Sequence, residues 1–146
     1  MSYYNVILQR YHDPIREEKL AGGTVTPGHL VKKNSSDAIV VHSTAAGHVK
    51  PLQVAIEDEL QGKDISDNYS SGDLIQTEIL LPGDKFYGIL TTSQTIVIGD
   101  LLESAGNGTL RKMELASTDD PQLPIARAEE AKTTTGSVAR IICRAV

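Results

Sequence analysis

Turn signals divide this sequence into short segments, and their spacing constrains the fold more than any other feature. Pro27-Gly28 and Pro82-Gly83 are strong turn pairs, and Gly72, Gly83 and Gly99 each precede an aspartate and then a short run suited to a strand. Proline presets the first dihedral angle of a turn, and glycine accepts a positive φ. Runs rich in Val, Ile and Thr recur at intervals of roughly ten residues, which is typical of a β-sandwich or β-barrel. We therefore predict an all-β fold.

The runs between the turn signals give the expected strands, which are residues 29–33, 38–42, 52–58, 74–80, 85–90, 95–98, 101–103, 110–113 and 137–146. Asn107-Gly108 separates two of them and predicts a hairpin with a type I′ turn. Evidence for helices is limited. Residues 54–60 have the length of two helical turns, and residues 125–132 are rich in Ala and Glu but also alternate as a strand would. The expected all-β fold can therefore include one short helix.

Length and composition exclude several classes of protein. A chain of 146 residues fits one domain. No apolar run approaches the roughly 18–20 residues of a membrane span, and residues 1–20 lack the basic flank and apolar stretch of a signal peptide. The single Cys143 excludes an internal disulfide framework and a Cys-based zinc site, and we expect synthesis in a reducing cytoplasm. A net charge of -5 argues against non-specific nucleic-acid binding.

The first twenty residues differ in composition from the rest of the chain. They contain Tyr3, Tyr4 and Tyr11, which are half of all the aromatic residues, together with many charged side chains. Tyrosine provides a large amphipathic contact area at low entropic cost. This composition predicts an arm over residues 1–20 that is poorly ordered alone and docks on a partner, followed by a single β-rich domain over residues 21–146. The alternative is a first strand that joins the sheet of the domain itself.

Charge is also uneven along the chain. Residues 57–84 carry eight acidic side chains and one lysine, whereas residues 1–33 carry five basic and three acidic ones. Blocks of like charge usually form a solvated outer face. The other interpretation is a surface that meets a basic partner.

Residues that could support catalysis or bind metals form no recognised pattern. His29, His42 and His48 fall within twenty residues, but no pair has the spacing that places two ligands on one face of a strand or helix. The chain has no G-x-S-x-G motif, and Cys143 lies in an apolar run where a thiol acts as a small hydrophobe. A Ser–His–Asp triad stays open because triads are recognised by geometry. A metal-dependent or hydrolytic β-barrel enzyme that uses these histidines is therefore one alternative function.

Two further patterns resemble ligand sites only in part. Asp64, Asp67, Asn68 and Asp73 supply oxygen ligands for calcium but not in EF-hand spacing. Gly106-Asn107-Gly108 lacks the residues that complete a phosphate-binding loop. The residues themselves therefore supply no recognised catalytic set and no recognised metal site. A β domain with these features suits binding, and a glycan-binding domain is a second alternative.

Three stretches resemble the small head decoration (capsid cement) proteins of tailed bacteriophages. They are AGGTVTPGHLVKKNSSDAIVVHST, VAIEDELQGKDISDNYSSGD and LPGDKFYGILTTSQTIVIGDLLESAGNGTLRK, and the closing IARAEEA and SVARIICRAV also fit the layout of that family. Together they cover most of residues 21–146. The most distinctive part is IGDLLESAGNGTLRK, because the individual turns recur in many β proteins but their order does not.

The resemblance implies an all-β fold of the β-tulip kind and a homotrimer on the outside of a phage capsid. It implies a non-enzymatic protein with no cofactor that binds the major capsid protein and stabilises the head, and composition argues against a nucleic-acid or membrane partner. In such proteins an N-terminal arm commonly reaches onto the shell. That role would fall here on Tyr3, Tyr4, Val6, Ile7, Leu8, Arg10 and Tyr11.

Overall fold

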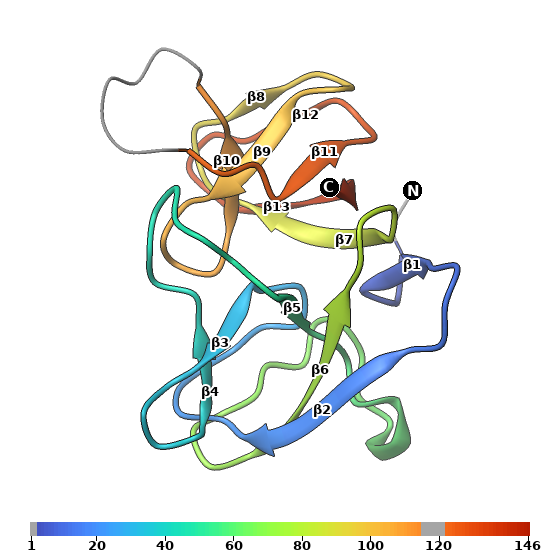
Figure 1. Cartoon of the computed structure of the whole chain (residues 1–146), viewed down its shortest axis with the longest axis vertical. Helices are drawn as coiled ribbons and strands as arrows, with labels where there is room; N and C mark the ends of the chain where they lie inside the picture. The colour runs from blue at the N-terminus through green and yellow to red at the C-terminus, as the bar shows by residue number, and fades with distance from the viewer. Residues whose placement is uncertain (1–2, 115–121) are drawn as a thin grey trace.

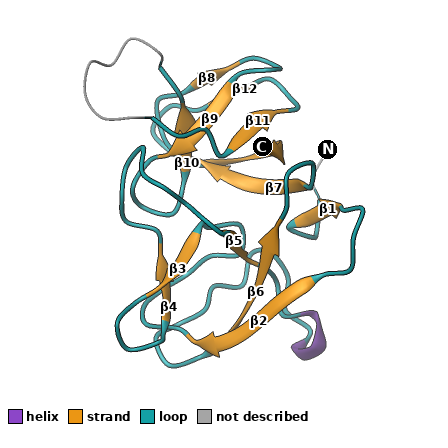
Figure 2. Cartoon of the chain, viewed as in Figure 1, coloured by secondary structure: helices purple, strands orange, loops and turns teal. Residues whose placement is uncertain are grey.

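The computed structural model describes residues 3–114 and 122–146, which are almost entirely strands and turns. The elements are β1 (Ile7–Gln9), β2 (Ile15–Leu20), β3 (Val31–Lys33), β4 (Ile39–Val41), β5 (Leu52–Ala55), the 3₁₀ turn η1 (Glu59–Gln61), β6 (Leu74–Leu80), β7 (Lys85–Leu90), β8 (Thr95–Ile96), β9 (Leu101–Ser104), β10 (Leu110–Lys112), β11 (Ala126–Ala128), β12 (Lys132–Thr133) and β13 (Ala139–Ala145). Within these residues, no helix is long and apolar enough to cross a membrane. The predicted all-β class is confirmed (Figure 2).

Five strands in the upper half of Figure 1 close into a small barrel. The order is β7, β10, β9, β11 and β13, and β13 pairs back onto β7 along most of its length. β7 and β10 run parallel and pair at Leu90 and Leu110, while the other neighbours are antiparallel. Closure leaves the ring without a free edge, since every strand in it has two neighbours.

Small side chains let this barrel close tightly. Ala126, Ala128 and Cys143 are fully buried in the same core as Phe86 and several leucines. Gly88 follows Phe86 at the two-residue period of one strand face, and a Cβ added there would lie 2.8 Å from Leu110 Cδ1. A small barrel has little interior space, so a chain with only six aromatic residues fills it well.

The lower half of the molecule is an open arrangement. β2, β6 and β5 form an antiparallel sheet, and β3 and β4 form a hairpin beside it (Figure 1). Single bridges join Leu30 to Val54 and Ala21 to Ile39. A second, smaller core lies here and contains Ala21, Val25, Val31, Ile39, Ala55, Tyr69 and Ile75.

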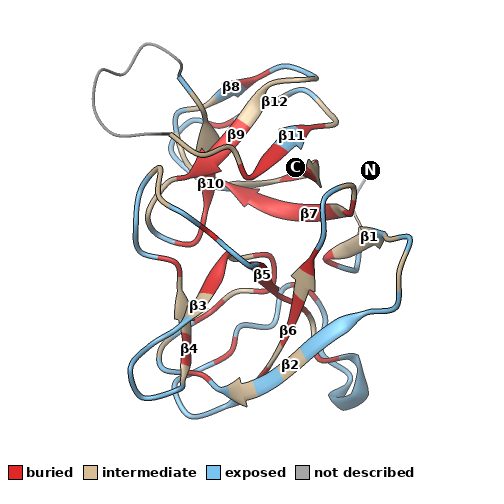
Figure 3. Ribbon diagram, in the orientation of Figure 1, coloured by how far each residue is buried: buried red, intermediate tan, exposed pale blue. Residues whose placement is uncertain are grey.

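Residues 7–20 belong to the fold, which corrects the expected arm. β1 pairs with β7, and β2 pairs with β6 over six consecutive residues. Val6 is fully buried in the barrel core. The alternative, a first strand that joins the domain's own sheets, describes the structure. Figure 3 shows why composition was misleading: β2 is largely exposed, as an edge strand with charged side chains should be, although its backbone is paired.

Other expectations hold with local differences. Each of the nine predicted runs contains or overlaps a strand. The hairpin at Asn107-Gly108 is confirmed as β9–β10, but its turn is longer than type I′. Ala105 donates a backbone hydrogen bond to Thr109. A type I′ turn would require a positive φ at Asn107 and Gly108, whereas the positive φ values here are those of Gly106 (93°) and Gly108 (81°). Residues 54–60 end β5 and form η1, and residues 125–132 contain β11 and the start of β12.

Candidate partner-binding surface

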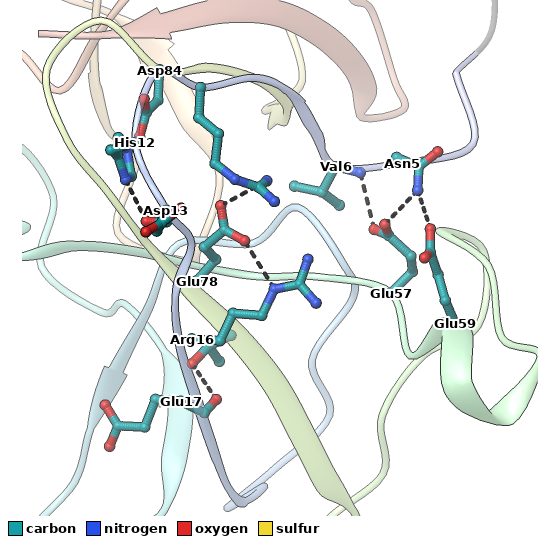
Figure 4. Close-up of polar contacts among 12 residues, drawn as sticks. Asn5, Val6, His12, Asp13, Arg16, Glu17, Glu57, Glu59, Glu78 and Asp84 are labelled. Carbon is teal, nitrogen blue, oxygen red and sulfur yellow. Dashed lines mark hydrogen bonds and ion pairs between the residues drawn. The ribbon is translucent and has the colours of Figure 1, made fainter.

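The N-terminal segment, residues 3–20, is held against the acidic residues of the middle of the chain. Glu78 on β6 is fully buried and receives two arginines from this segment. Arg16 Nε lies 3.1 Å from Glu78 Oε1 (Figure 4), and Arg10 Nη1 lies 3.4 Å from Glu78 Oε2. A buried carboxylate is costly unless it is paired and hydrogen-bonded, so these contacts compensate Glu78 and fix the segment to β6.

A second contact fixes the bend between β1 and β2. His12 Nε2 lies 2.6 Å from Asp84 Oδ2, and its Nδ1 lies 2.7 Å from the Asp13 carbonyl oxygen. Asp84 is buried in the predicted Pro82-Gly83 turn and also accepts the backbone N–H of Leu81. The hydrogen bond to Asp84, followed by that to Asp13, raises the pKa of His12.

A third contact holds the start of the segment. Glu57 accepts a hydrogen bond from the backbone N–H of Val6 at 3.0 Å and another from Asn5 Nδ2 at 2.8 Å. Asn5 also reaches Glu59, as Figure 4 shows. A carboxylate that accepts backbone and side-chain N–H groups forms strong, charge-assisted hydrogen bonds.

These contacts show what the acidic residues 57–84 do. Asp58, Glu78 and Asp84 are buried, whereas Glu59, Asp64, Asp67 and Asp73 are exposed. The solvated outer face was therefore the right interpretation for part of the segment only. The basic groups that Glu78 and Asp84 meet come from the chain's own N-terminal segment.

The seven residues predicted to bind a partner divide into two groups. Val6 is in the core, Ile7 and Leu8 pack against it, Arg10 pairs with Glu78, and the ring of Tyr3 stands edge-on to Tyr87 at 5.5 Å between centroids. Val6 is therefore closed to any partner. Tyr4 and Tyr11 are the exposed members, at 77% and 75% of their full exposure.

Sequence reasoning missed another exposed apolar pair. Leu20 at the end of β2 lies opposite Leu74 at the start of β6, and both side chains are about half exposed. Apolar residues at opposed positions of an antiparallel pair form one continuous patch. The patch could have been foreseen only by pairing the two runs, because each leucine stands alone in its own segment.

The histidines have structural contacts in place of ligand roles. His29 Nδ1 accepts the backbone N–H of Thr26, and burial lowers its pKa to about 4. Burial also lowers the pKa of His42, whose Nε2 lies 2.9 Å from the His48 carbonyl oxygen. His48 itself is exposed. In the part of the chain that the structure describes, no three His, Cys, Asp or Glu side chains are grouped to hold a metal ion.

One serine–histidine contact exists, but its geometry does not suit catalysis. His42 Nδ1 lies 3.1 Å from Ser104 Oγ. Ser104 is fully buried, and the other ring nitrogen meets a carbonyl oxygen where a triad has a carboxylate. Cys143 is also buried, which raises the pKa of its thiol and suppresses the nucleophilic thiolate.

The candidate calcium residues serve as turn caps. Asp64 Oδ1 accepts the N–H of Ser66, Asp67 Oδ2 accepts the N–H of Asp64, and Asp73 Oδ2 accepts the N–H of Ser70. Such aspartate-to-backbone bonds are a common way of forming short turns. Gly106 and Gly108 similarly belong to the β9–β10 hairpin and not to a phosphate-binding loop.

Comparison with known proteins places the fold. No family model matches the sequence, and no curated protein matches it either. Among solved structures, the chain is similar to the head fiber gp8.5 N base of bacteriophage phi29. The TM-score is 0.57 and the identity 15%, and the match covers 91% of this chain and 94% of that one. At this identity the likeness shows that the two chains share a fold.

Proposed function

We propose that this protein is a structural component of a phage head that binds the outside of the mature capsid and stabilises it without catalysis. The observation that carries the proposal is the agreement between two sources: the order of turns resembles head decoration proteins, and the fold matches a phage head fiber base over nearly its full length. Because a fold can host unrelated functions, the binding surface needs its own argument.

Tyr4 and Tyr11 are the best candidates for contact with the major capsid protein. Both are exposed, and both lie on a segment that Glu57, Glu78 and Asp84 hold in place. A rigidly placed aromatic side chain loses little entropy when it is buried at an interface. Tyrosine is also enriched among the residues that dominate binding energy.

Stabilisation would follow from many weak bridges. A protein that binds only the intact shell adds free energy that must be lost before the shell opens. A homotrimer would present three copies of Tyr4 and Tyr11 at fixed spacing and so gain avidity. The Leu20–Leu74 patch is a candidate contact between subunits, because burying opposed leucines on association removes apolar area from water.

A co-sedimentation titration on mature phage heads that lack the protein tests the proposal. The double variant Tyr4→Ser, Tyr11→Ser should bind roughly a thousandfold more weakly, if each ring contributes about 2 kcal/mol and the contributions add. Leu60→Ser is the matched control, since Leu60 is 99% exposed on η1 and should bind as the unchanged protein does. Failure of the unchanged protein to bind heads would overturn the proposed function.

Light scattering tests self-association on the same samples. A trimer should appear for the unchanged protein, and Leu20→Ser with Leu74→Ser should shift it towards monomer. A monomer both in solution and on the capsid would exclude the trimer while leaving capsid binding to be judged by the titration.

A further inference from the structure

A cavity of about 420 Å³ opens in the lower half of the molecule, beside the sheet formed by β2, β6 and β5. Its volume lies within the range of roughly 300–1,000 Å³ that is usual for sites that bind small molecules. The lining combines apolar side chains with cationic ones. Val31, Val49, Pro51 and Ile79 supply the apolar part, and Lys32, Lys33 and Lys50 bring positive charge.

One wall of the cavity is a face of the three-stranded sheet. Gln53 on β5 lies opposite Ile79 on β6. Thr77, two residues before Ile79, lies opposite Glu17 on β2, so the four side chains share a face. Gln53 Nε2 donates to Thr77 Oγ1 at 2.7 Å, and Thr77 Oγ1 donates to the Glu17 carbonyl oxygen at 2.8 Å. Gln53 and Thr77 are buried, so this wall is already ordered before a ligand binds, which lowers the entropic cost of binding.

The charge of the lining is opposite to that of the whole chain. The net charge of the protein is -5, yet three lysines and one acid line the cavity, and that acid, Glu17, pairs with Lys33. Lys32 Nζ meets a hydroxyl, Ser43 Oγ, at 2.6 Å. In the part of the chain that the structure describes, Lys32 and Lys50 form no ion pair. Two ammonium groups therefore favour an anion at this site.

The type of cation indicates which anion fits. An arginine fork suits a planar carboxylate, but within residues 3–114 and 122–146 no arginine lines the cavity. Lysine binds phosphate as a point charge. A phosphate monoester carries about -1.5 to -2 charges at neutral pH and three acceptor oxygens, which match two ammonium groups. The apolar part of the lining calls for an apolar body beside the phosphate.

We propose that the cavity binds a soluble organic phosphate, with its phosphate at Lys32 and Lys50 and its apolar body against Val31, Val49 and Ile79. A lipid surface suits the site less well. Among the described residues, none of the exposed large apolar side chains lines the cavity, so its mouth lacks the apolar rim with which proteins enter a bilayer. This proposal does not depend on the capsid role.

The direct test is an NMR titration of the isotope-labelled protein with phenyl phosphate. The backbone amide signals of Val31, Lys32 and Gln53 should shift together and give one dissociation constant. Inorganic phosphate and phenol should each bind at least about tenfold more weakly, because each offers only the charge or only the apolar body.

Charge-neutralising variants test the lysines. Lys32→Gln, Lys50→Gln should lower the affinity for phenyl phosphate by about tenfold or more, since both ammonium groups without a carboxylate partner are removed. Lys63→Gln, Lys132→Gln is the matched control, because it removes the same charge outside the cavity and should stay within about twofold of the unchanged protein. Amide signals far from the cavity show whether each variant is folded. If the double variant unfolds, Lys50→Gln alone, at an exposed position, should still weaken binding.

Equal losses in both double variants, equal affinity for phenol, or no binding of phenyl phosphate would each overturn the proposal. Equal affinity for inorganic phosphate would do the same and leave an adventitious ion only. Co-sedimentation with phosphatidylcholine vesicles that contain phosphatidic acid, which is also a phosphate monoester, distinguishes the source. We expect no binding to these vesicles, and binding that phenyl phosphate displaces would replace the soluble ligand with a lipid headgroup.

Discussion

In the barrel, five strands pair in a ring around Phe86 and a set of small and aliphatic side chains, and the one buried acid on these strands, Glu103, pairs with Arg111 of the neighbouring strand. The N-terminal segment lies on the outside of the molecule and is attached differently. Val6 is its one fully buried apolar residue, and the rest is held by Glu57, Glu78 and Asp84. One region depends on packing, and the other on paired charges along a sheet edge.

This difference determines how each region should respond to its surroundings. Apolar packing is not screened by salt, whereas ion pairs with partly exposed arginines are. Opening of an edge segment also exposes less surface than opening of a closed ring. We therefore expect salt to weaken the attachment of the N-terminal segment more than the packing of the barrel.

Removing residues 1–20 should have the largest effect. It removes the arginine partners of Glu78 and the His12 contact of Asp84, at a cost of about 3–5 kcal/mol for a broken buried pair, and it also opens a hole where Val6 was. A loss of this size approaches the whole stability of many domains, so the truncated protein should be largely unfolded by urea titration. A truncated protein with an unchanged urea midpoint would show that residues 1–20 are dispensable for folding, as composition predicts.

Phe86→Ala is the counterpart in the barrel. Phe86 is fully buried, and replacing it with alanine should lower the free energy of unfolding by about 3–5 kcal/mol, because the closed barrel cannot collapse onto the cavity left behind. The loss should be the same at low and high salt, as measured by urea unfolding. Tyr4→Ala serves as the control, since an exposed ring should change stability by less than about 0.5 kcal/mol. If the stability lost in Phe86→Ala depended strongly on salt, the distinction between a packed barrel and a charge-held N-terminal segment would be wrong.

The barrel could be predicted from sequence more fully than the N-terminal segment, for a physical reason. Strand and turn signals are local, so the observed bounds of β7 coincide with the predicted run, and those of β9 and β10 differ from the predicted runs by one residue. The partners of Glu78 lie 62 and 68 residues away, and no local pattern reveals them. Residues 15–20, Ile-Arg-Glu-Glu-Lys-Leu, looked like a solvated arm because four charges obscure a strand whose backbone is paired.

The candidate sites divide in the same way. Tyr4 and Tyr11 were predicted to bind a partner because aromatic residues are rare in this chain; the structure leaves both exposed, and their binding stays a prediction. Val6 was misassigned because an apolar triplet looks the same whether it faces a partner or its own core. The cavity lined by Val31, Lys32, Lys50 and Gln53 could not be predicted, since its lysines come from separate segments of the chain.

Glu78→Gln should separate charge from shape at the N-terminal segment. The amide keeps the size of the side chain but cannot accept from both arginines, so the expected loss is about 1–3 kcal/mol by urea unfolding. The difference from the unchanged protein should shrink at high salt, because Arg16 is about half exposed. Glu18→Gln on exposed β2 is the control and should have little effect. Equal losses for the two variants would mean that Glu78 contributes no more than a surface acid.

His12→Asn should have the smallest effect, and one confined to a pH window. The hydrogen bonds to Asp84 and Asp13 raise the pKa of His12 above its ordinary value of 6.5, and Glu78 acts in the same direction. A raised pKa in the folded state means that the protonated ring stabilises the fold. That contribution is fully present below pH 6.5 and is lost as the pH rises through the raised value.

The difference in melting temperature between the unchanged protein and His12→Asn should therefore be largest near pH 6 and vanish towards pH 9. His29 and His42 cannot produce this pattern, because burial lowers their pKa values and removes stability as the pH falls instead. His48→Asn is the matched control, since His48 is exposed and has no ion pair in the described part of the chain. A difference that is flat or grows with pH would show that His12 does not hold the bend between β1 and β2 by its charge. The charged contacts that hold the N-terminal segment would then be those of Arg10 and Arg16 alone.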